Sequence, residues 1–322
     1  DMDAVDAFLA DMNADIDCDS VDATVAYVAG NSEPFRFTDE QAGRELETDA
    51  IRARIEASIL NLSPETEALK PKEISPKVYR VELENATVLR ARVIVPLSGS
   101  AAAQENAALA AVQFQGARIE PGESLSFNQT VGMRMEESGY TAAEEPAYGQ
   151  NIVGVGGGVC QVSTALYRLA LLGGLEIAER SAAVYPVDYC EIGQEAAVSD
   201  QGLDLVLTNN TDAPLFLIVR VYAENDGQTM EWQLIGKENE SRFSLVSEVE
   251  TIDAPEEPVY VRDSEGRYAT YADERIPVSE ARPGYRATVS LVDENGETVR
   301  VVSEDTYDAM AQIVYVGVQQ RN

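Results

Sequence analysis

A glycine-rich turn that ends at a cysteine constrains the fold of this chain more than any other stretch. Residues 154–167 read GVGGGVCQVSTALY. Beyond the cysteine, apolar residues recur at the spacing of one helix face until Gly173-Gly174, a pair that typically ends a helix. These apolar residues are Val162, Leu166, Leu169 and Leu172. The pattern predicts a helix that begins at or near Cys160 and is entered from a glycine turn.

This position would give Cys160 the properties of a nucleophile. The first N–H groups of a helix lack internal partners and carry the positive end of its dipole, which favours a thiolate over a thiol. Gly156, Gly157 and Gly158 would let backbone N–H groups approach a substrate oxyanion closely. We therefore expect acyl-transfer chemistry, with the N–H groups of residues 159–162 as the oxyanion site.

Other interpretations of the same stretch exist. Cysteines outside disulfides are usually small buried side chains, so an inert Cys160 stays open as an alternative. A phosphate-binding loop is disfavoured, because Cys160-Gln161 stand where that motif carries its lysine.

Motifs on both sides of the turn resemble the VanW domain family. They are Pro121–Asn128 (PGESLSFN), Val131-Gly132, Gly139-Tyr140, Gly156–Tyr167 and Tyr185–Tyr189 (YPVDY), and the resemblance covers roughly residues 90–235. The family is named for an accessory gene in vancomycin-resistance clusters and is common in Gram-positive cell-envelope proteins. Some members are held to be L,D-transpeptidases that cross-link peptidoglycan through the cysteine matching Cys160. The resemblance implies an exported, extracellular, cell-wall-associated protein whose partners are peptidoglycan stem peptides or glycan.

The chain contains no histidine, so the usual base for a cysteine nucleophile is missing. The family often carries a histidine shortly before the Pro-Val pair, where this chain has residues 181–184, SAAV. We therefore expect Tyr185, Asp188 or Tyr189 to orient groups or carry protons, and Gln161 to orient or donate a hydrogen bond.

Three further polar residues are candidates for substrate binding. Arg134 could bind a substrate carboxylate in bidentate fashion, or pair with Glu136 or Glu137 instead. Ser163 and Thr164 are expected to cap the helix or line the pocket. Two functions follow: a cysteine acyltransferase resembling the L,D-transpeptidases, or a non-catalytic cell-wall-binding protein that retains a degenerate VanW cleft.

The pattern of elements predicts an α+β, multidomain chain divided at residues 1–89, 90–236 and 237–322. The first part, with Val21-Asp22-Ala23 and a turn before a helix, resembles the peptidoglycan-binding domain often found before VanW domains. The last part, with the ending Asp305–Gly317, resembles the G5 module, an extended β module linked to cell-wall sugar binding.

Local patterns predict individual elements of these domains. Helices are expected at Thr48–Leu60, with Ile51, Ile55, Ile59 and Leu60 buried, and at Asn106–Phe114, with Leu109, Val112 and Gln113 facing inward or partly inward. Strands are expected at Leu175–Ala183, continuing through Tyr185–Cys190, and at Leu203–Leu207, Leu215–Tyr222 and Met230–Ile235, the last three joined as hairpins; Glu294-Asn295-Gly296 predicts another hairpin.

Composition limits the partners. Lys and Arg number 24 against 56 Asp and Glu, a net charge of −32, which disfavours nucleic acid and anionic lipid. No apolar run of about 18 residues is present. The opening Asp1-Met2-Asp3 lacks a signal sequence, so we expect an export signal or membrane anchor before residue 1. Cys18, Cys160 and Cys190 form neither a disulfide framework nor a metal cluster, so no metal and no cofactor are expected.

Overall fold

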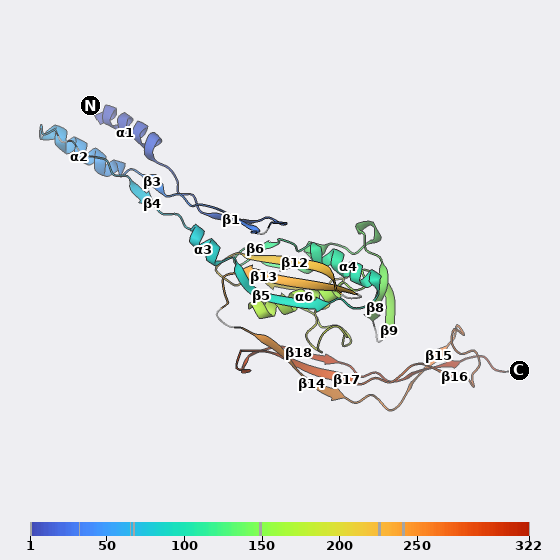
Figure 1. The fold of residues 1–322 in the computed structure, drawn as a ribbon. Coiled ribbons are helices and arrows are strands. Elements are labelled where there is room, and N and C mark those ends of the chain that lie inside the picture. The colour runs from blue at the N-terminus through green and yellow to red at the C-terminus, as the bar shows by residue number, and fades with distance from the viewer. Residues whose placement is uncertain are drawn as a thin grey trace. The chain divides into compact units, whose positions relative to one another are not determined.

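The computed structural model describes residues 2–31, 33–64, 66, 68–147, 150–224, 227–239 and 242–321 (Figure 1). The chain divides into two compact units, Asp1–Val88 and Leu89–Asn322. Helices and mostly antiparallel sheets occur together, which confirms the α+β class. The division into three domains stays a prediction.

The first unit is built from small pieces around a small core. Its elements are α1 (Met2–Ile16), β1 (Thr24–Tyr27), β2 (Phe35–Thr38), β3 (Gly43–Glu45), α2 (Thr48–Leu60), β4 (Lys72–Ile74) and α3 (Arg80–Asn85). Helix α2 has the predicted bounds, but its predicted buried face is wrong: Ile59 and Leu60 are exposed. The helix packs mainly on the single helix α1, which covers only part of its apolar side.

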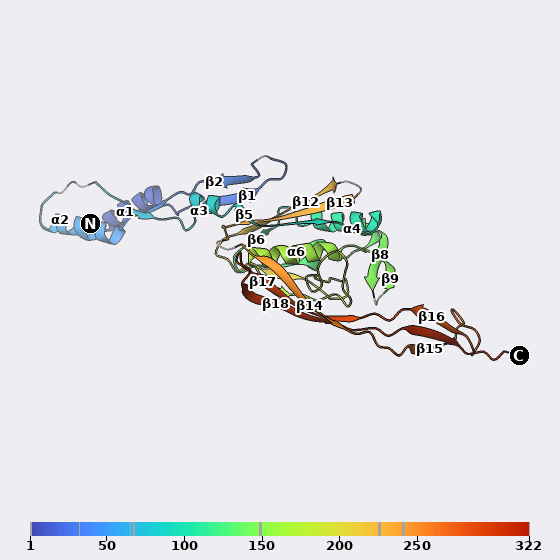
Figure 2. The same cartoon turned by 60° about the horizontal axis from the view of Figure 1, so that its bottom comes forward.

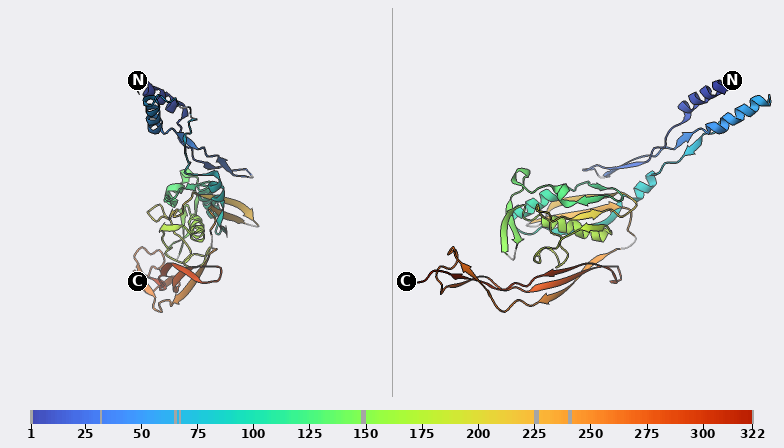
Figure 3. Two further views of the ribbon diagram at one scale, coloured as in Figure 1. Left: turned by 90° about the vertical axis from the view of Figure 1, so that its left-hand side faces the viewer. Right: turned by 180° about the vertical axis from the view of Figure 1, so that it is seen from behind.

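A sheet covered by two helices forms the core of the second unit. The sheet order is β5 (Val88–Pro96), β13 (Gly227–Gly236), β12 (Leu215–Glu224) and β6 (Arg118–Ile119). Helices α4 (Ala101–Val112) and α6 (Cys160–Gly173) pack against this sheet and against each other, and Figure 3 shows these layers from two further sides. Trp232 of β13 is fully buried in this core, and its ring centroid lies 5.5 Å from that of Phe114.

The predicted hairpin of β12 and β13 is confirmed, with Leu217 opposite Leu234 and Val219 opposite Trp232. The predicted hairpin before it is wrong. Strand β11 (Val206–Thr208) pairs instead with β10 (Glu176–Glu179) and β7 (Ser124–Ser126) in a separate sheet.

The predicted strand through Tyr185–Cys190 is also wrong, because this segment is a series of bends. Pro186 has no N–H group to give to a ladder. The chain also reverses after β10, where Ser181 forms a bridge with Ala197.

Several shorter elements also belong to this part of the second unit. They are α5 (Phe127–Val131), the 3₁₀-helix η1 (Glu136–Ser138), and the hairpin of β8 (Ala142–Ala147) and β9 (Gln150–Val155). The sequence analysis did not predict this hairpin. It leads directly into the glycine turn.

The last third of the chain consists of two small sheets. In the first, β14 (Ser244–Ile252), β17 (Gly284–Val292) and β18 (Thr298–Tyr307) lie side by side (Figure 2). The second contains β15 (Val259–Asp263), β19 (Ile313–Gly317) and β16 (Arg275–Ser279), with β15 and β19 parallel. The predicted hairpin at Glu294–Gly296 is confirmed, since Asp293 N–H donates to Glu297 O across the turn between β17 and β18. None of the helices in the described ranges is long and apolar enough to cross a membrane.

Candidate functional site

Helix α6 begins at Cys160, as the glycine turn predicts, and ends at Gly174 in a left-handed cap. Every residue from Gly156 to Tyr167 is buried except Gly158 and Cys160, which are partly exposed. Since Gly158 has no side chain, Cys160 is the one residue of this stretch that combines partial exposure with a side chain.

The glycines are explained by the close packing of the turn. Gly156 and Gly158 have φ angles of +84° and +99°, which disfavour other residues. A Cβ on Gly157 would lie 2.6 Å from the carbonyl oxygen of Ala143 in β8, and one on Gly158 would overlap the carbonyl oxygen of Ala103 in α4. The turn is thus fixed against both elements.

Asn106 of α4 holds this turn, and the sequence analysis did not single it out. Its buried side chain donates to Gly157 O at 3.0 Å and Thr141 O at 2.9 Å, and accepts from Thr141 N–H at 2.9 Å. The sequence feature that could have identified Asn106 is an amide side chain within the alanine-rich run of α4. The inward face predicted for this helix is partly wrong, since Val112 is 49% exposed.

Three of the four N–H groups expected to bind an oxyanion are used within the turn. Val159 N–H donates to Gly156 O at 3.2 Å, Gln161 N–H to Gly158 O at 3.2 Å, and Val162 N–H to Val159 O at 2.9 Å. For these three groups the expected role is wrong, because the tight turn gives each an internal acceptor.

Gln161 joins α6 to the segment that follows β5. Its side-chain oxygen accepts from Ser98 N–H at 2.8 Å, and its side-chain nitrogen donates to Ser98 O at 3.2 Å. Both ends of the amide are therefore bonded to one residue. Gln161 positions the start of the helix.

Ser163 and Thr164 hold a second segment against α6. Ser163 Oγ donates to Ala196 O at 2.6 Å, and Thr164 Oγ1 accepts from Ala196 N–H at 3.1 Å. Neither caps the helix, whose N-cap is Val159. Two residues beyond Ala196, the carbonyl of Val198 accepts a hydrogen bond from Cys160 Sγ at 3.5 Å.

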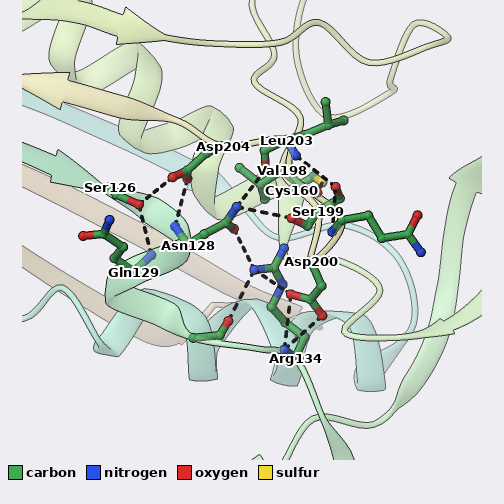
Figure 4. A network of polar contacts seen from close by, with 12 residues as sticks. Ser126, Asn128, Gln129, Arg134, Cys160, Val198, Ser199, Asp200, Leu203 and Asp204 are labelled. Carbon is green, nitrogen blue, oxygen red and sulfur yellow. Dashed lines mark hydrogen bonds and ion pairs between the residues drawn. The ribbon is translucent and has the colours of Figure 1, made fainter.

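Arg134 lies beside this segment, in an internal ion pair (Figure 4). It is 8% exposed, its guanidinium is 2.9 Å from the carboxylate of Asp200, and it donates to Asn128 Oδ1 at 2.7 Å. The expected pairing with Glu136 or Glu137 is wrong. Its partner comes from a loop 66 residues further along the chain.

The motif PGESLSFN ends in two side chains that fix the same loop. Asn128 donates to Leu203 O at 2.8 Å and to Ser199 O at 3.2 Å, and its N–H donates to Asp204 at 2.9 Å (Figure 4). Ser126 Oγ also donates to Asp204. Asn128, Asp200 and Asp204 were not predicted as site residues, although the first lies in a recognised motif.

The glycine turn and helix α6 lie in a region that matches a known protein family. A sequence model of the family described as VanW like protein matches residues 102–233. The central part of the chain is a VanW-like domain.

Two curated relatives share this region. Uncharacterized protein YoaR of Bacillus subtilis (strain 168) is 34% identical over 125 residues, which are 39% of this chain and 41% of YoaR. Vancomycin B-type resistance protein VanW of Enterococcus faecalis (strain ATCC 700802 / V583) is 28% identical over 179 residues, 54% of this chain and 61% of that protein. The chain thus spans less than two thirds of either relative.

One solved structure, described as "Crystal structure of HP0197-G5", is 14% identical and covers 24% of this chain and 100% of its own, with a TM-score of 0.11. So low a score carries no argument, and the G5 resemblance stays a prediction.

Tyr185 and Asp188 lie in the bends after β10, where Tyr185 is partly buried and Asp188 is exposed. Their neighbour Tyr189 interacts electrostatically with the Cys160 thiol. Burial raises the pKa of Tyr189 well above its usual range, and the nearby Cys160 sulfur raises it further. The phenol is therefore protonated at neutral pH and can donate a hydrogen bond, but it is not a base.

A cavity of about 730 Å³ lies away from Cys160. Its walls include Tyr167 and Gly174 of α6 and its cap, Glu179 of β10, and Arg300 of β18. A void of about 10 Å³, too small for a ligand, lies between Gln161, Thr164 and Tyr189. Among the described residues, no three His, Cys, Asp or Glu side chains are grouped to hold a metal ion.

Proposed function

We propose that this chain is a cell-envelope protein that acts on peptidoglycan by acyl transfer through Cys160. The observation that carries the proposal is the partial exposure of Cys160, at the start of α6, within a motif whose other side chains are buried. Gln161, Ser163 and Thr164 each hold a neighbouring segment in place around it. The similarity to the vancomycin resistance protein VanW supports the cell-envelope setting.

In this reaction the Cys160 sulfur attacks the carbonyl carbon of a stem peptide. The peptide C–N bond breaks, the departing amine takes up the proton that the thiol has lost, and a thioester remains. An amine of a second stem peptide then attacks the thioester carbonyl carbon, the C–S bond breaks, and the proton that the amine loses returns to the Cys160 sulfur as the new amide forms. Backbone donors at Val159, Gln161 and Val162 are occupied, and we assign Tyr189, whose phenol keeps its proton near Cys160, as a donor to the developing oxyanion.

Non-catalytic cell-wall binding is the second candidate, and specific observations favour it. The chain has no histidine, and Arg134 already pairs with Asp200. The thiol itself donates to the Val198 carbonyl, a contact that requires its proton. In this alternative the VanW-like domain binds peptidoglycan, and residues 237–322 contribute contacts to its glycan. Export to the cell wall belongs to both candidates.

Intact mass after incubation with a carbapenem or a tetrapeptide stem separates the two. We expect a covalent adduct on the wild-type chain and on Cys190→Ala, the matched control, and none on Cys160→Ala. A chain without an adduct, whose Cys160 also resists iodoacetamide when folded, would exclude acyl transfer. Retention on purified cell walls would then support binding alone.

A further inference from the structure

One loop of the VanW-like domain is bound at one end by the C-terminal sheet and lies on Cys160 at the other. We call residues 193–200 the strap. It follows the bends after β10 and passes from the sheet of β14, β17 and β18 across α6 to the thiol. Its contacts join parts of the chain that are more than a hundred residues apart in sequence.

The first end of the strap is fixed by buried charges. The Glu195 carboxylate is fully buried, accepts from Gly193 N–H at 3.1 Å, and accepts the hydroxyl hydrogen of Tyr307 in β18. Arg180 donates to both carboxylate oxygens of Asp305 at 2.7 Å, and to the backbone carbonyl of Glu195 at 2.8 Å. Because a buried carboxylate is costly without partners, β18 stabilises this conformation of the strap.

The backbone of the strap also lies directly on the same sheet. Gly193 has a φ of +91°, and a Cβ there would lie 2.8 Å from a methyl of Val289 and 3.1 Å from Ala287, both in β17. Gln194 donates to Ser247 Oγ of β14 at 3.1 Å. All three strands of the sheet therefore contact the strap.

The other end of the strap fixes the surroundings of the thiol. Ser163 and Thr164 bind Ala196, the Val198 carbonyl accepts from Cys160 Sγ, and Asp200 pairs with Arg134. Val198 lies three positions after Glu195, a span of about 10 Å in extended chain. Ala196, which Ser163 and Thr164 bind, lies directly beside Glu195, so a displacement of Glu195 would strain these bonds and shift the carbonyl that contacts the thiol.

We propose that Asp305 and Tyr307 are positioning residues for Cys160: the C-terminal sheet sets the strap, and the strap sets the access and hydrogen bonding of the thiol. The proposal rests on Cys160 as the reacting group of the proposed function. It makes the chemistry of the VanW-like domain dependent on the docking of the C-terminal sheet. Undocking would release the Val198 carbonyl and expose Sγ.

The test measures iodoacetamide modification of Cys160 by peptide mapping in the full chain. Tyr307→Phe removes one hydroxyl, and Asp305→Asn weakens the pair with Arg180. We expect about three- to tenfold faster modification in each, the effect of losing one hydrogen bond. Glu250→Gln is the matched control, because it breaks an exposed pair with Arg286 on the same sheet at 2.8 Å. Asp305→Glu, which keeps the carboxylate, should restore the wild-type rate.

Hydrogen exchange makes the result independent of global unfolding. The proposal predicts faster exchange at residues 193–200 in Tyr307→Phe while α6 stays protected. Unchanged modification and unchanged exchange in Tyr307→Phe would overturn it, as would equal acceleration in Glu250→Gln. A wild-type chain that forms no adduct and whose folded Cys160 resists iodoacetamide, together with faster modification in Tyr307→Phe, would refute the proposed function and leave the positioning role intact.

Discussion

Cys160 and Cys190 are both partly exposed, but they lie in different parts of the fold and their thiols have different surroundings. Cys160 is partly exposed at the first turn of α6. Burial raises the pKa of Cys190 to about 12, and the nearby Glu195 carboxylate contributes to this increase. The thiolate is the reactive form, so Cys190 should be almost inert at neutral pH.

We therefore predict that iodoacetamide at about pH 8 modifies Cys190 far more slowly than the exposed Cys18, because at a pKa of about 12 only about one Cys190 thiol in ten thousand is a thiolate at that pH. Peptide mapping over time measures both rates in one sample. In urea the difference should disappear, which serves as the control. Comparable rates in the folded chain would show that Cys190 is not held in the buried environment described.

Single residues of the site were partly predictable from the sequence. Cys160 could be found because the glycine run and the apolar period are local signals. The partners of Gln161 and Arg134 could not be found, because Ser98 and Asp200 lie 63 and 66 residues away. Which polar side chain holds a loop and which meets a substrate depends on such distant pairs.

The glycine turn shows how one element depends on its neighbours. We predict that Gly158→Ala lowers the free energy of unfolding of the second unit by about 3 kcal/mol or more, because the methyl would overlap Ala103 O at a φ of +99°. Gly122→Ala is the matched control: its φ is +77° and nothing lies within 4 Å of the added Cβ. We expect it to cost only about 1 kcal/mol, from backbone strain alone.

Fluorescence of Trp232 measures both changes, since it is the chain's single tryptophan and lies in the core of the VanW-like domain. Equal losses in urea unfolding for the two variants would contradict the packing role of Gly158. An increased rate of Cys160 modification in Gly158→Ala alone would show that the turn also positions the thiol.

Strand pairs that are joined by a short turn were predictable from the sequence, and pairs of strands that lie far apart in the sequence were not. The hairpin at Glu294–Gly296 and the pairing of β12 with β13 follow from local turns. Strand β11 pairs with β7, whose Ser124 is opposite Thr208 across more than 80 residues. Nothing in the period of residues 203–207 specifies that partner, so the sequence pattern favoured the wrong hairpin.

At the scale of the whole chain, the charge of −32 opposes folding at neutral pH through repulsion among carboxylates. Acidification towards about pH 5 begins to neutralise ordinary carboxylates and relieves this repulsion. Other carboxylates act in the opposite sense. Hydrogen bonds from the backbone N–H groups of Ala269 and Tyr268 hold the pKa of Asp263 below its ordinary value, and those of Tyr271 and Thr270 do the same for Glu274.

A carboxylate whose pKa is lower in the folded state stabilises that state above its unfolded pKa of about 4, and this contribution is lost as the pH falls through the folded pKa. We therefore predict that Tm rises from pH 7 to a maximum between about pH 4.5 and 6, and then falls steeply below about pH 4.

Asp263→Asn should lower the Tm of the C-terminal sheets at pH 7. The amide oxygen would accept the hydrogen bonds from the N–H groups of Tyr268 at 2.6 Å and Ala269 at 2.9 Å more weakly than the carboxylate does. As the pH falls through its folded pKa the wild-type carboxylate becomes protonated, so the two curves should converge towards the acid end of the range. Circular dichroism melts of both chains across this range measure the difference, and a difference that stays constant from pH 7 to pH 3 would show that the charge of Asp263 does not contribute to stability.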